Sequence, residues 1–248
     1  MKQLMFFAVI ILLAVSGAQA AEIRINAGGP LIETYVIPTK SEYEKKTGNT
    51  ILFEDRGFKN GLENLEKGSI DMLQSGFAPQ EFPEKVRSER IQVKSVSAFK
   101  ITPVAEEEIL VAINRMNPVQ RLSKQQLKDI FTGKTRNWKD VGGDDMPITV
   151  VWGRFMHGPN QLFISKMLDG AKVFSEFHSS KGFSEAKAVV RGKSGAIMIY
   201  PTRIKDPVLK FPEVPKLVRS TIFITKGEPN PAVKSYMDFL VKEVRKGK

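Results

Sequence analysis

Cysteine is absent from the 248 residues of this chain. Its absence excludes a disulfide framework, a cysteine-ligated metal centre and a lipid anchor on an N-terminal cysteine. Histidine is scarce, because the chain holds only His157 and His178, and neither lies in an H-E-x-x-H or His-x-x-x-His pattern. The nucleophile motif G-x-S-x-G is also missing. We therefore expect no catalytic residues, no metal ligands and no cofactor.

Long hydrophobic runs are missing except at the start of the chain. Residues 4–15 are uninterruptedly apolar, Lys2 precedes them, and Ala18-Gln19-Ala20 fits a small-residue cleavage site. We interpret residues 1–20 as a signal peptide cleaved after Ala20, which predicts a periplasmic protein. The run is shorter than the ~20 residues that span a bilayer, so we expect no membrane insertion after cleavage.

Acidic residues are the minority, with 27 Asp and Glu against 38 Lys and Arg and a net charge of +11. An excess of positive charge favours anionic partners through long-range attraction. Because the lysines are spread along the chain, the charge could also serve solubility alone. There is no compact basic cluster with interleaved aromatic residues, and an exported protein rarely meets nucleic acid, so we expect no nucleic-acid partner.

Short β-type runs alternate with amphipathic helical stretches, without an internal repeat or a low-complexity segment. Several runs are apolar at every position, as in sheets that helices cover on both faces. Strands separated by helices favour an α/β fold with mainly parallel sheets flanked by helices. The expected strands are residues 22–27, 50–55, 70–75, 109–114, 148–153, 196–200 and 220–225.

The stretch 122–133, LSKQQLKDIFTG, carries clear helix-boundary signals. Ser123 and Gln126 have the spacing of a capping box, in which each side chain bonds the other residue's backbone N–H. Gly133 supplies the C-terminal stop. The sequence therefore predicts a helix that begins after Ser123 and ends just before Gly133.

Two other helices are expected near the ends of the chain. Asn230 is a favourable N-cap for a helix over 230–244. Near the start, SEYEKKTGN reads as a helix end that stops at Gly48. Pro38 lies upstream, so that helix is either kinked or begins near Thr39, and the sequence leaves both readings open.

The segment 117–151, NPVQRLSKQQLKDIFTGKTRNWKDVGGDDMPITVV, resembles the central signature of bacterial periplasmic phosphate-binding proteins of ABC transporters. In that family a Leu-Thr/Ser-x-x-Gln-Leu-x-x-Ile-Phe-x-Gly-Lys-x-x-Asn-Trp stretch precedes the strand leading to a ligand loop. The likeness covers essentially the whole chain after the signal peptide. Further resembling segments are residues 27–36, 56–72, 189–201 and 222–240.

The resemblance implies a two-lobed class II solute-binding fold with the ligand in a cleft between the lobes. The first lobe would comprise residues 21–103 plus 202–248, and the second lobe residues 104–201. The chain would cross near Thr102 and return near Thr202. The residue patterns agree with this, because ligands of open α/β sheets lie at the carboxyl ends of strands, where helices begin.

The turn after the strand 148–153 carries the main ligand expectation. The family has Arg-x-x-Gly-Ser-Gly-Thr at a helix start, where free N–H groups and a partial positive charge suit anions. By that resemblance Arg154 would pair with oxyanion oxygens. His157 would add a titratable donor, Gly158 lacks the family's hydroxyl, Pro159 removes one N–H, and the amide of Asn160 would replace the threonine hydroxyl.

The remaining loops also depart from the family pattern. Gly76 stands where the family has an aspartate that accepts a hydrogen bond from protonated phosphate. Asp71 lies nearby in a strand and is interpreted as a helix-end or strand-end partner. With Lys59 added, the site tilts toward a doubly charged oxyanion or a larger organic anion. Phe58, Phe155 and Met156 supply apolar surface for that anion or pack between the lobes. The implied ligand-binding set is Arg154, Asn160, Gly158, His157, Gly28, Gly29, Phe58, Lys59 and Ser75.

The leading functional hypothesis is a monomeric periplasmic solute-binding protein that performs no chemistry on its ligand. It would capture phosphate, or a related anion such as sulfate, molybdate or an organic anion, and deliver it to an ABC permease. The alternative is a degenerate binding fold without a transport role, acting in sensing or in an envelope complex. The lost ligand-shell features favour this alternative, and the resemblance over the whole chain favours the first.

Overall fold

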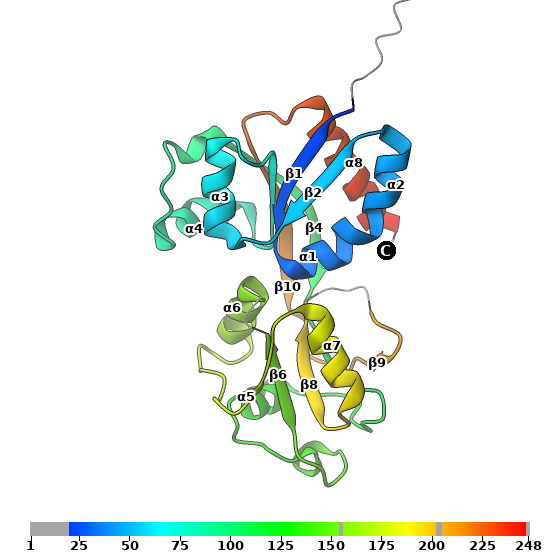
Figure 1. The fold of residues 1–248 in the computed structure, drawn as a ribbon. Helices are drawn as coiled ribbons and strands as arrows, with labels where there is room; N and C mark the ends of the chain where they lie inside the picture. Colours follow the sequence, from blue (N-terminus) through cyan, green and yellow to red (C-terminus); the bar gives the residue numbers. More distant parts are fainter. Residues whose placement is uncertain (1–19, 154–155, 202–204, 247–248) are drawn as a thin grey trace, which may run out of the picture.

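The computed structural model describes residues 20–153, 156–201 and 205–246. The chain forms two lobes, each built on a five-stranded sheet (Figure 1). The α/β class and the two-lobed architecture expected from the sequence are confirmed. Residues 1–19 of the predicted signal peptide and Arg154 fall outside the described residues.

The sheet of the first lobe has the strand order β2-β1-β3-β10-β4. Strands β1, β2 and β3 pair in parallel, and β10 runs antiparallel to both of its neighbours. The sheet is thus parallel except for β10, which comes last in the sequence. Its strands are β1 (Glu22–Ala27), β2 (Thr50–Glu54), β3 (Met72–Ser75), β4 (Phe99–Glu108) and β10 (Val218–Lys226).

The sheet of the second lobe repeats this plan with the order β7-β6-β8-β5-β9. Strand β6 pairs in parallel with β7 and β8, and β5 runs antiparallel to β8 and β9. Each sheet therefore contains one strand that opposes the rest. The strands are β5 (Leu110–Asn114), β6 (Thr149–Gly153), β7 (His178–Ser180), β8 (Ala196–Tyr200) and β9 (Leu209–Lys210).

Helices cover these sheets, as Figure 1 shows, with α2, α3, α4 and α8 on the first lobe and α5, α6 and α7 on the second. The α-helices are α1 (Gly29–Leu31), α2 (Ile37–Thr47), α3 (Gly57–Lys67), α4 (Phe82–Ser88), α5 (Lys124–Phe131), α6 (His157–Lys166), α7 (Phe183–Gly192) and α8 (Pro231–Lys246). A π-helical stretch spans Ile32–Val36, and 3₁₀ turns span Pro79–Glu81, Val96–Ala98 and Trp138–Val141. Among the described residues, no helix is both long and apolar enough to cross a membrane.

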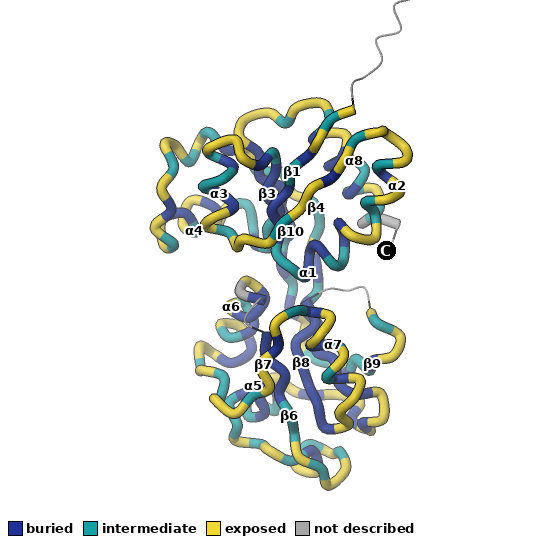
Figure 2. The backbone as a smooth tube through the Cα atoms, in the orientation of Figure 1, coloured by how far each residue is buried: buried dark blue, intermediate teal, exposed yellow. Residues whose placement is uncertain are grey.

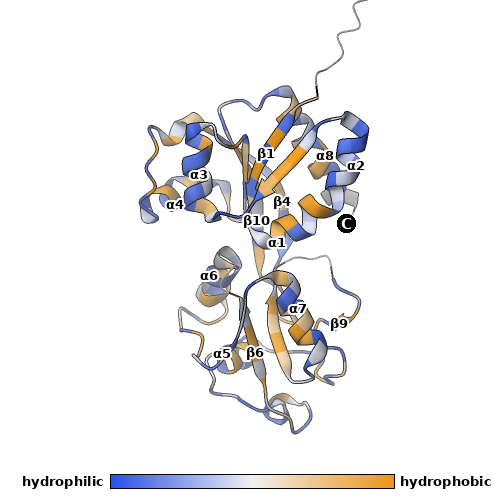
Figure 3. Ribbon diagram, in the orientation of Figure 1, coloured by the Kyte–Doolittle hydropathy of each residue, from blue (hydrophilic) through white to orange (hydrophobic). Residues whose placement is uncertain are grey.

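The cores lie against the central strands, which are the buried and apolar segments in Figures 2 and 3. Every residue of β5 and of β8 is buried. A strand buried on both faces needs apolar side chains at successive positions, which is why LVAIN and AIMIY do not alternate. The second lobe has one core cluster, and the first lobe has two, one built around β1, α2 and α8 and the other around α3 and α4.

The chain crosses between the lobes later than the resemblance implied. Strand β4 stays in the first sheet as far as Glu108, so the crossing lies at Ile109 and not near Thr102. On the return, β9 still belongs to the second sheet and Leu217 still packs in the second core, so the chain crosses back there and not near Thr202. The two connections are thus the junctions β4–β5 and Leu217–β10.

Strand β4 was not expected because Pro103 and a run of glutamates interrupt its sequence. The proline is tolerated because the register of β4 against β10 shifts between Thr221 and Ile222, with Pro103 paired to Ile222. The shift leaves Val104, next to the proline, unpaired, and β4 is an edge strand of its sheet, where a residue without an N–H is tolerated.

The expected helix boundaries at α5 and α8 are confirmed. Ser123 Oγ accepts from the Gln126 backbone N at 3.2 Å, and Gln126 Oε1 accepts from the Ser123 N at 2.8 Å. Gly133 has φ +79°, the left-handed conformation of a helix stop. At α8, Asn230 Oδ1 accepts from the Val233 N at 2.9 Å.

Pro38 neither breaks the first long helix nor marks its start. The chain is helical from Gly29, passes through the π-helical stretch Ile32–Val36, and continues as α2 to Gly48, which has φ +75°. A proline removes one helix N–H and crowds the preceding turn. A wider π turn directly before Pro38 accommodates both effects without ending the helix.

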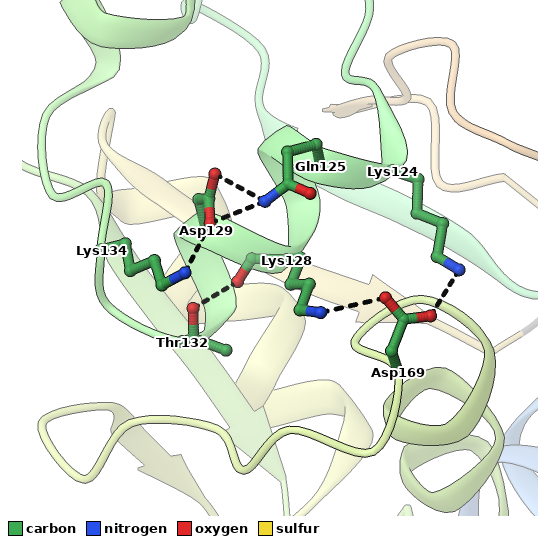
Figure 4. Close-up of polar contacts among 7 residues, drawn as sticks. All are labelled: Lys124, Gln125, Lys128, Asp129, Thr132, Lys134 and Asp169. Atoms are coloured by element: carbon green, nitrogen blue, oxygen red, sulfur yellow. Dashed lines mark hydrogen bonds and ion pairs between the residues drawn. The ribbon is translucent and has the colours of Figure 1, made fainter.

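Helix α5 is fixed to the turn that follows α6 by charged contacts (Figure 4). Lys124 Nζ and Lys128 Nζ donate to the two oxygens of Asp169 at 2.6 and 3.0 Å. Hydrogen bonds from these two lysines hold the pKa of Asp169 below its ordinary value. On the other side of α5, Asp129 accepts from Gln125 and pairs with Lys134. The two lysine contacts thus join α5 to the segment that follows α6.

Candidate functional site

A cavity of about 470 Å³ lies between the lobes at the ends of the first sheet's strands. Its wall is formed by the last residues of β1 and β3, the first residues of β10, the start of α3, and the first turns of α6. In Figure 1, α6 faces the first lobe across this region. The position agrees with the rule that ligands of open α/β sheets bind beyond the carboxyl ends of the strands.

The structure brings some of the expected ligand residues together at this cavity. Gly28, Phe58, Ser75 and Gly158 line it. Other members of the expected set do not line it, namely Gly29, Lys59 and Asn160. Arg154, Phe155 and the side chain of His157 lie outside what the structure describes.

The first turn of helix α6 lies at the cavity, and no side chain caps the start of this helix. The first N–H groups of a helix have no intrahelical acceptor, and the N–H of Asn160 already bonds the carbonyl of Met156 at 2.8 Å. Pro159 lines the cavity but has no N–H to offer. Of the described residues in this turn, His157 and Gly158 are those whose backbone N–H lies before the first intrahelical hydrogen bond.

Asn160 has a different environment from the one expected. Its Nδ2 donates to the carbonyl of Gly153, the last residue of β6, at 2.9 Å, and the residue is 7% exposed. The amide therefore ties the start of α6 to the end of β6 rather than facing the cavity. The interpretation of Asn160 as a stand-in for the threonine hydroxyl is not supported by this contact.

A carboxylate of the protein itself occupies the backbone donors of the first two ligand loops. Asp55 Oδ2 accepts from the N–H of Gly29 at 2.7 Å, and Asp55 Oδ1 accepts from the N–H of Gly57 at 3.1 Å. Asp55 also lines the cavity. Amide donors at helix starts can bind anions, and Asp55 already occupies two of them in this lobe.

Sequence reasoning missed a buried arginine at the base of the cavity. Arg219, near the start of β10, is 6% exposed, and its Nη2 donates to Glu107 Oε2 at 3.0 Å and to the carbonyl of Pro201 at 2.9 Å. The side chain of Glu107 is fully buried. An ion pair so deeply buried needs additional hydrogen bonds to be tolerated, and the Pro201 carbonyl supplies one of them.

Gly76 is explained by this arginine. A Cβ added at Gly76 would lie 2.6 Å from Nη1 and 3.1 Å from Cζ of Arg219, closer than real contacts allow. Any side chain at position 76, including the aspartate of the related family, would displace the guanidinium. The departure seen in the sequence is thus the loss of a carboxylate together with the placement of a guanidinium beside the same loop.

Further polar groups in the wall come from strand interiors, where the sequence gives no functional signal. Gln74 on β3 is 2% exposed, and its Oε1 has no hydrogen-bond partner among the described residues. Asn26 on β1 accepts from the N–H of Arg56 at 2.8 Å through Oδ1. Together with Arg219, these side chains come from three neighbouring strands, β1, β3 and β10.

Apolar side chains make up much of the rest of the wall. Phe58 lines the cavity and packs edge-on against Phe77, with ring centroids 5.1 Å apart. Met156 is 1% exposed and also lines it, so these two residues serve the cavity and the packing at the same time. Asp71 lies away from the cavity and accepts from the backbone N and the guanidinium of Arg24, which confirms its interpretation as a strand-end partner.

The sequence is similar to a known protein family and to named relatives within it. The PBP superfamily domain matches residues 14–206. The phosphate-binding protein PstS of Bacillus subtilis (strain 168) is 26% identical over 233 residues, covering 88% of this chain and 74% of that protein. PstS of Staphylococcus aureus (strain USA300) is 28% identical over 138 residues, covering 54% of this chain and 40% of that protein.

A solved structure supports the same fold. A phosphate ABC transporter substrate-binding protein from Clostridium perfringens, with bound phosphate, superimposes with a TM-score of 0.72 at 22% identity. The superposition covers 88% of this chain and 92% of that chain. At this identity the likeness shows the fold, and the ligand of that protein is not thereby transferred to this one.

Proposed function

This chain belongs to the PBP superfamily, and from that membership we propose that it is a solute-binding protein that captures an oxyanion for an ABC transporter. The relatives named phosphate-binding protein PstS support phosphate or a related anion as the ligand class. No step of chemistry on the ligand is part of this proposal. Binding and delivery are the whole activity.

The observation that carries the proposal is the cavity between the lobes, with the uncapped start of α6 on one side and strand ends on the other. A helix start of this kind presents N–H donors and a partial positive charge to an anion. We propose that Arg154, which directly follows β6 in the sequence, adds a planar guanidinium to these donors. His157 would strengthen anion binding when protonated.

Capture would couple to closure of the lobes about the two connections at Ile109 and Leu217. The lobes already touch away from the cavity, because Ser184 Oγ on α7 donates to Glu33 Oε2 at 2.8 Å and Lys187 lies 3.9 Å from the same oxygen. A ligand held by both α6 and the first lobe would favour the closed arrangement, which the transporter would recognise. We further propose a periplasmic, monomeric protein released by cleavage after Ala20.

Isothermal titration calorimetry with phosphate, sulfate, molybdate and phosphonates tests the proposal. Replacing Arg154 by Gln should weaken the bound anion about 10- to 100-fold, because a hydrogen bond to a charged group contributes about 1.5–3 kcal/mol. Arg136→Gln is the matched control, since this arginine pairs with Glu176 on the surface of the second lobe. Absence of heat with every anion would refute oxyanion capture.

One observation favours the alternative of a binding fold without a transport role. Asp55 already occupies backbone donors of the first lobe, and Pro159 removes another from α6. A protein acting in sensing or in an envelope complex would not need these donors. Neighbouring permease and ATPase genes support transport, whereas a neighbouring sensor gene supports the alternative.

A further inference from the structure

The guanidinium of Arg219 has unused donors at the base of the cavity. Of its five N–H groups, those on Nη2 face Glu107 and Pro201. Among the residues that the structure describes, neither the buried Nε nor Nη1 has a hydrogen-bond partner. A buried donor without a partner is costly, so such a group is a candidate for binding a ligand acceptor.

The surroundings of Arg219 leave room for its Nη1 beside the wall of the cavity. Gly76 lines the cavity, and its lack of a side chain leaves room for Nη1, which lies 2.6 Å from where a Cβ would be. The hydrogen bonds to Glu107 and Pro201 hold the guanidinium in place, so little conformational freedom is lost on binding. In the same lobe, Asp55 occupies the amides of Gly29 and Gly57. The first lobe therefore offers an anion Arg219 rather than its loop amides.

The lining also indicates what the rest of the ligand is. Phe58, Phe77 and Leu162 present apolar surface, which an inorganic ion cannot use. Among the residues that the structure describes, the charged groups of the lining are the cations Arg219 and Lys85 and the carboxylates of Asp55, Glu81 and Glu89. Lys85 is already paired with Glu89 at 3.1 Å. Carboxylates in the wall disfavour a highly charged ion, and the apolar surface favours a single anionic head on an apolar body.

We infer that the cleft binds an organic anion, with its oxyanion head on Arg219 beside Gly76 and its apolar part against Phe58, Phe77 and Leu162. This inference rests on the proposed function, because it names the ligand class of the same cleft. Lys59, which the sequence suggested as the added positive charge, is exposed and does not line the cavity, so Arg219 takes that role. Arg219 would select ligands whose oxyanion head reaches Nη1 beside Gly76 while the rest of the molecule contacts the apolar wall.

The experiment compares inorganic phosphate, benzoate and phenylphosphonate by isothermal titration calorimetry on the full chain without its signal segment. The wild type should bind at least one of the two organic anions about tenfold or more tightly than phosphate. Gly76→Ala should weaken the organic anion about tenfold, because the added methyl group displaces Nη1 while the charge of Arg219 is kept. Gly192→Ala, at the end of α7 with open space around its Cβ position, should leave binding unchanged.

Arg219→Lys provides a second test that does not depend on the glycine. It keeps the positive charge opposite Glu107 but loses the planar fork, so organic anion binding should fall while circular dichroism shows a folded protein. The preference between benzoate and phenylphosphonate identifies the head group as carboxylate or phosphonate. Phosphate binding at least as tightly as both organic anions, or equal binding by Gly76→Ala and wild type, overturns the inference and leaves oxyanion capture standing. No binding of any anion overturns both.

Discussion

Glu107 and Arg219 join β4 to β10 beside the junction of the two lobes, and removing either charge should destabilise the fold strongly. Their contact is 3.0 Å long, with side chains 0% and 4% exposed. Replacing Glu107 by Gln leaves the Arg219 guanidinium without its charged partner in a largely buried site. Breaking a buried pair in this way costs about 3–5 kcal/mol, well above the 0–1 kcal/mol of a surface pair.

The double variant separates the charge effect from the packing effect. Glu107→Met combined with Arg219→Met removes both charges and keeps two long apolar chains of similar volume, a change that is often neutral or stabilising. We therefore expect the double variant to be far more stable than the sum of the two single variants predicts, with a coupling of about 2–3 kcal/mol. Such a coupling free energy is expected when each charge is stable in its buried site only while the other charge is present.

Urea unfolding followed by far-ultraviolet circular dichroism measures these differences through the midpoint and slope of each transition. Wild type, both single variants and the double variant form a complete thermodynamic cycle. If the free energy of unfolding of Glu107→Gln lies within about 0.5 kcal/mol of the wild-type value, the pair is not buried as its exposed fractions indicate, and the reasoning is wrong.

Two further predictions concern the second lobe. Gly195→Ala places a Cβ 2.1 Å from the backbone oxygen of Pro147, so it should destabilise the protein by about 2–3 kcal/mol in thermal or urea unfolding, whereas an unchanged midpoint would contradict the contact. Hydrogen bonds from Lys124 and Lys128 lower the pKa of Asp169, so its stabilising contribution is present above the unfolded pKa of about 3.9 and is lost as pH falls through the lower folded value. The melting temperature of wild type should thus exceed that of Asp169→Asn at pH 7 and converge with it toward pH 2, and a gap that persists in acid would show that the carboxylate charge is not the cause.

The sequence predicted those features that depend on neighbouring residues. The capping box of Ser123 and Gln126 and the N-cap at Asn230 involve residues three apart, so their spacing alone specifies the contact. The buried strands could be predicted for the same reason, because a continuous apolar run is a local pattern that does not depend on knowing the neighbouring strands. The stop at Gly48 likewise follows from one residue's conformational freedom.

The missed features depend on residues far apart along the chain. Arg219 meets Glu107 across 112 positions, and Asp55 meets Gly29 across 26, so neither contact leaves a local pattern. The proline in β4 hid a strand whose bulge is visible only once β10 lies beside it. The resemblance to the related family indicated that Gly76 replaces an aspartate. The reason for the glycine, which is the Arg219 guanidinium beside it, is seen only in the structure.

The carboxylate that Asp55 holds on the amides of Gly29 and Gly57 has a consequence for competition among solutes. A receptor that leaves such amides vacant is titrated by whichever small ion is most abundant around it, and a scarce solute must then displace that ion. A receptor that keeps them filled from within its own chain has no such competitor at these two amides. A scarce solute then has fewer resident ions to displace when it enters the cleft.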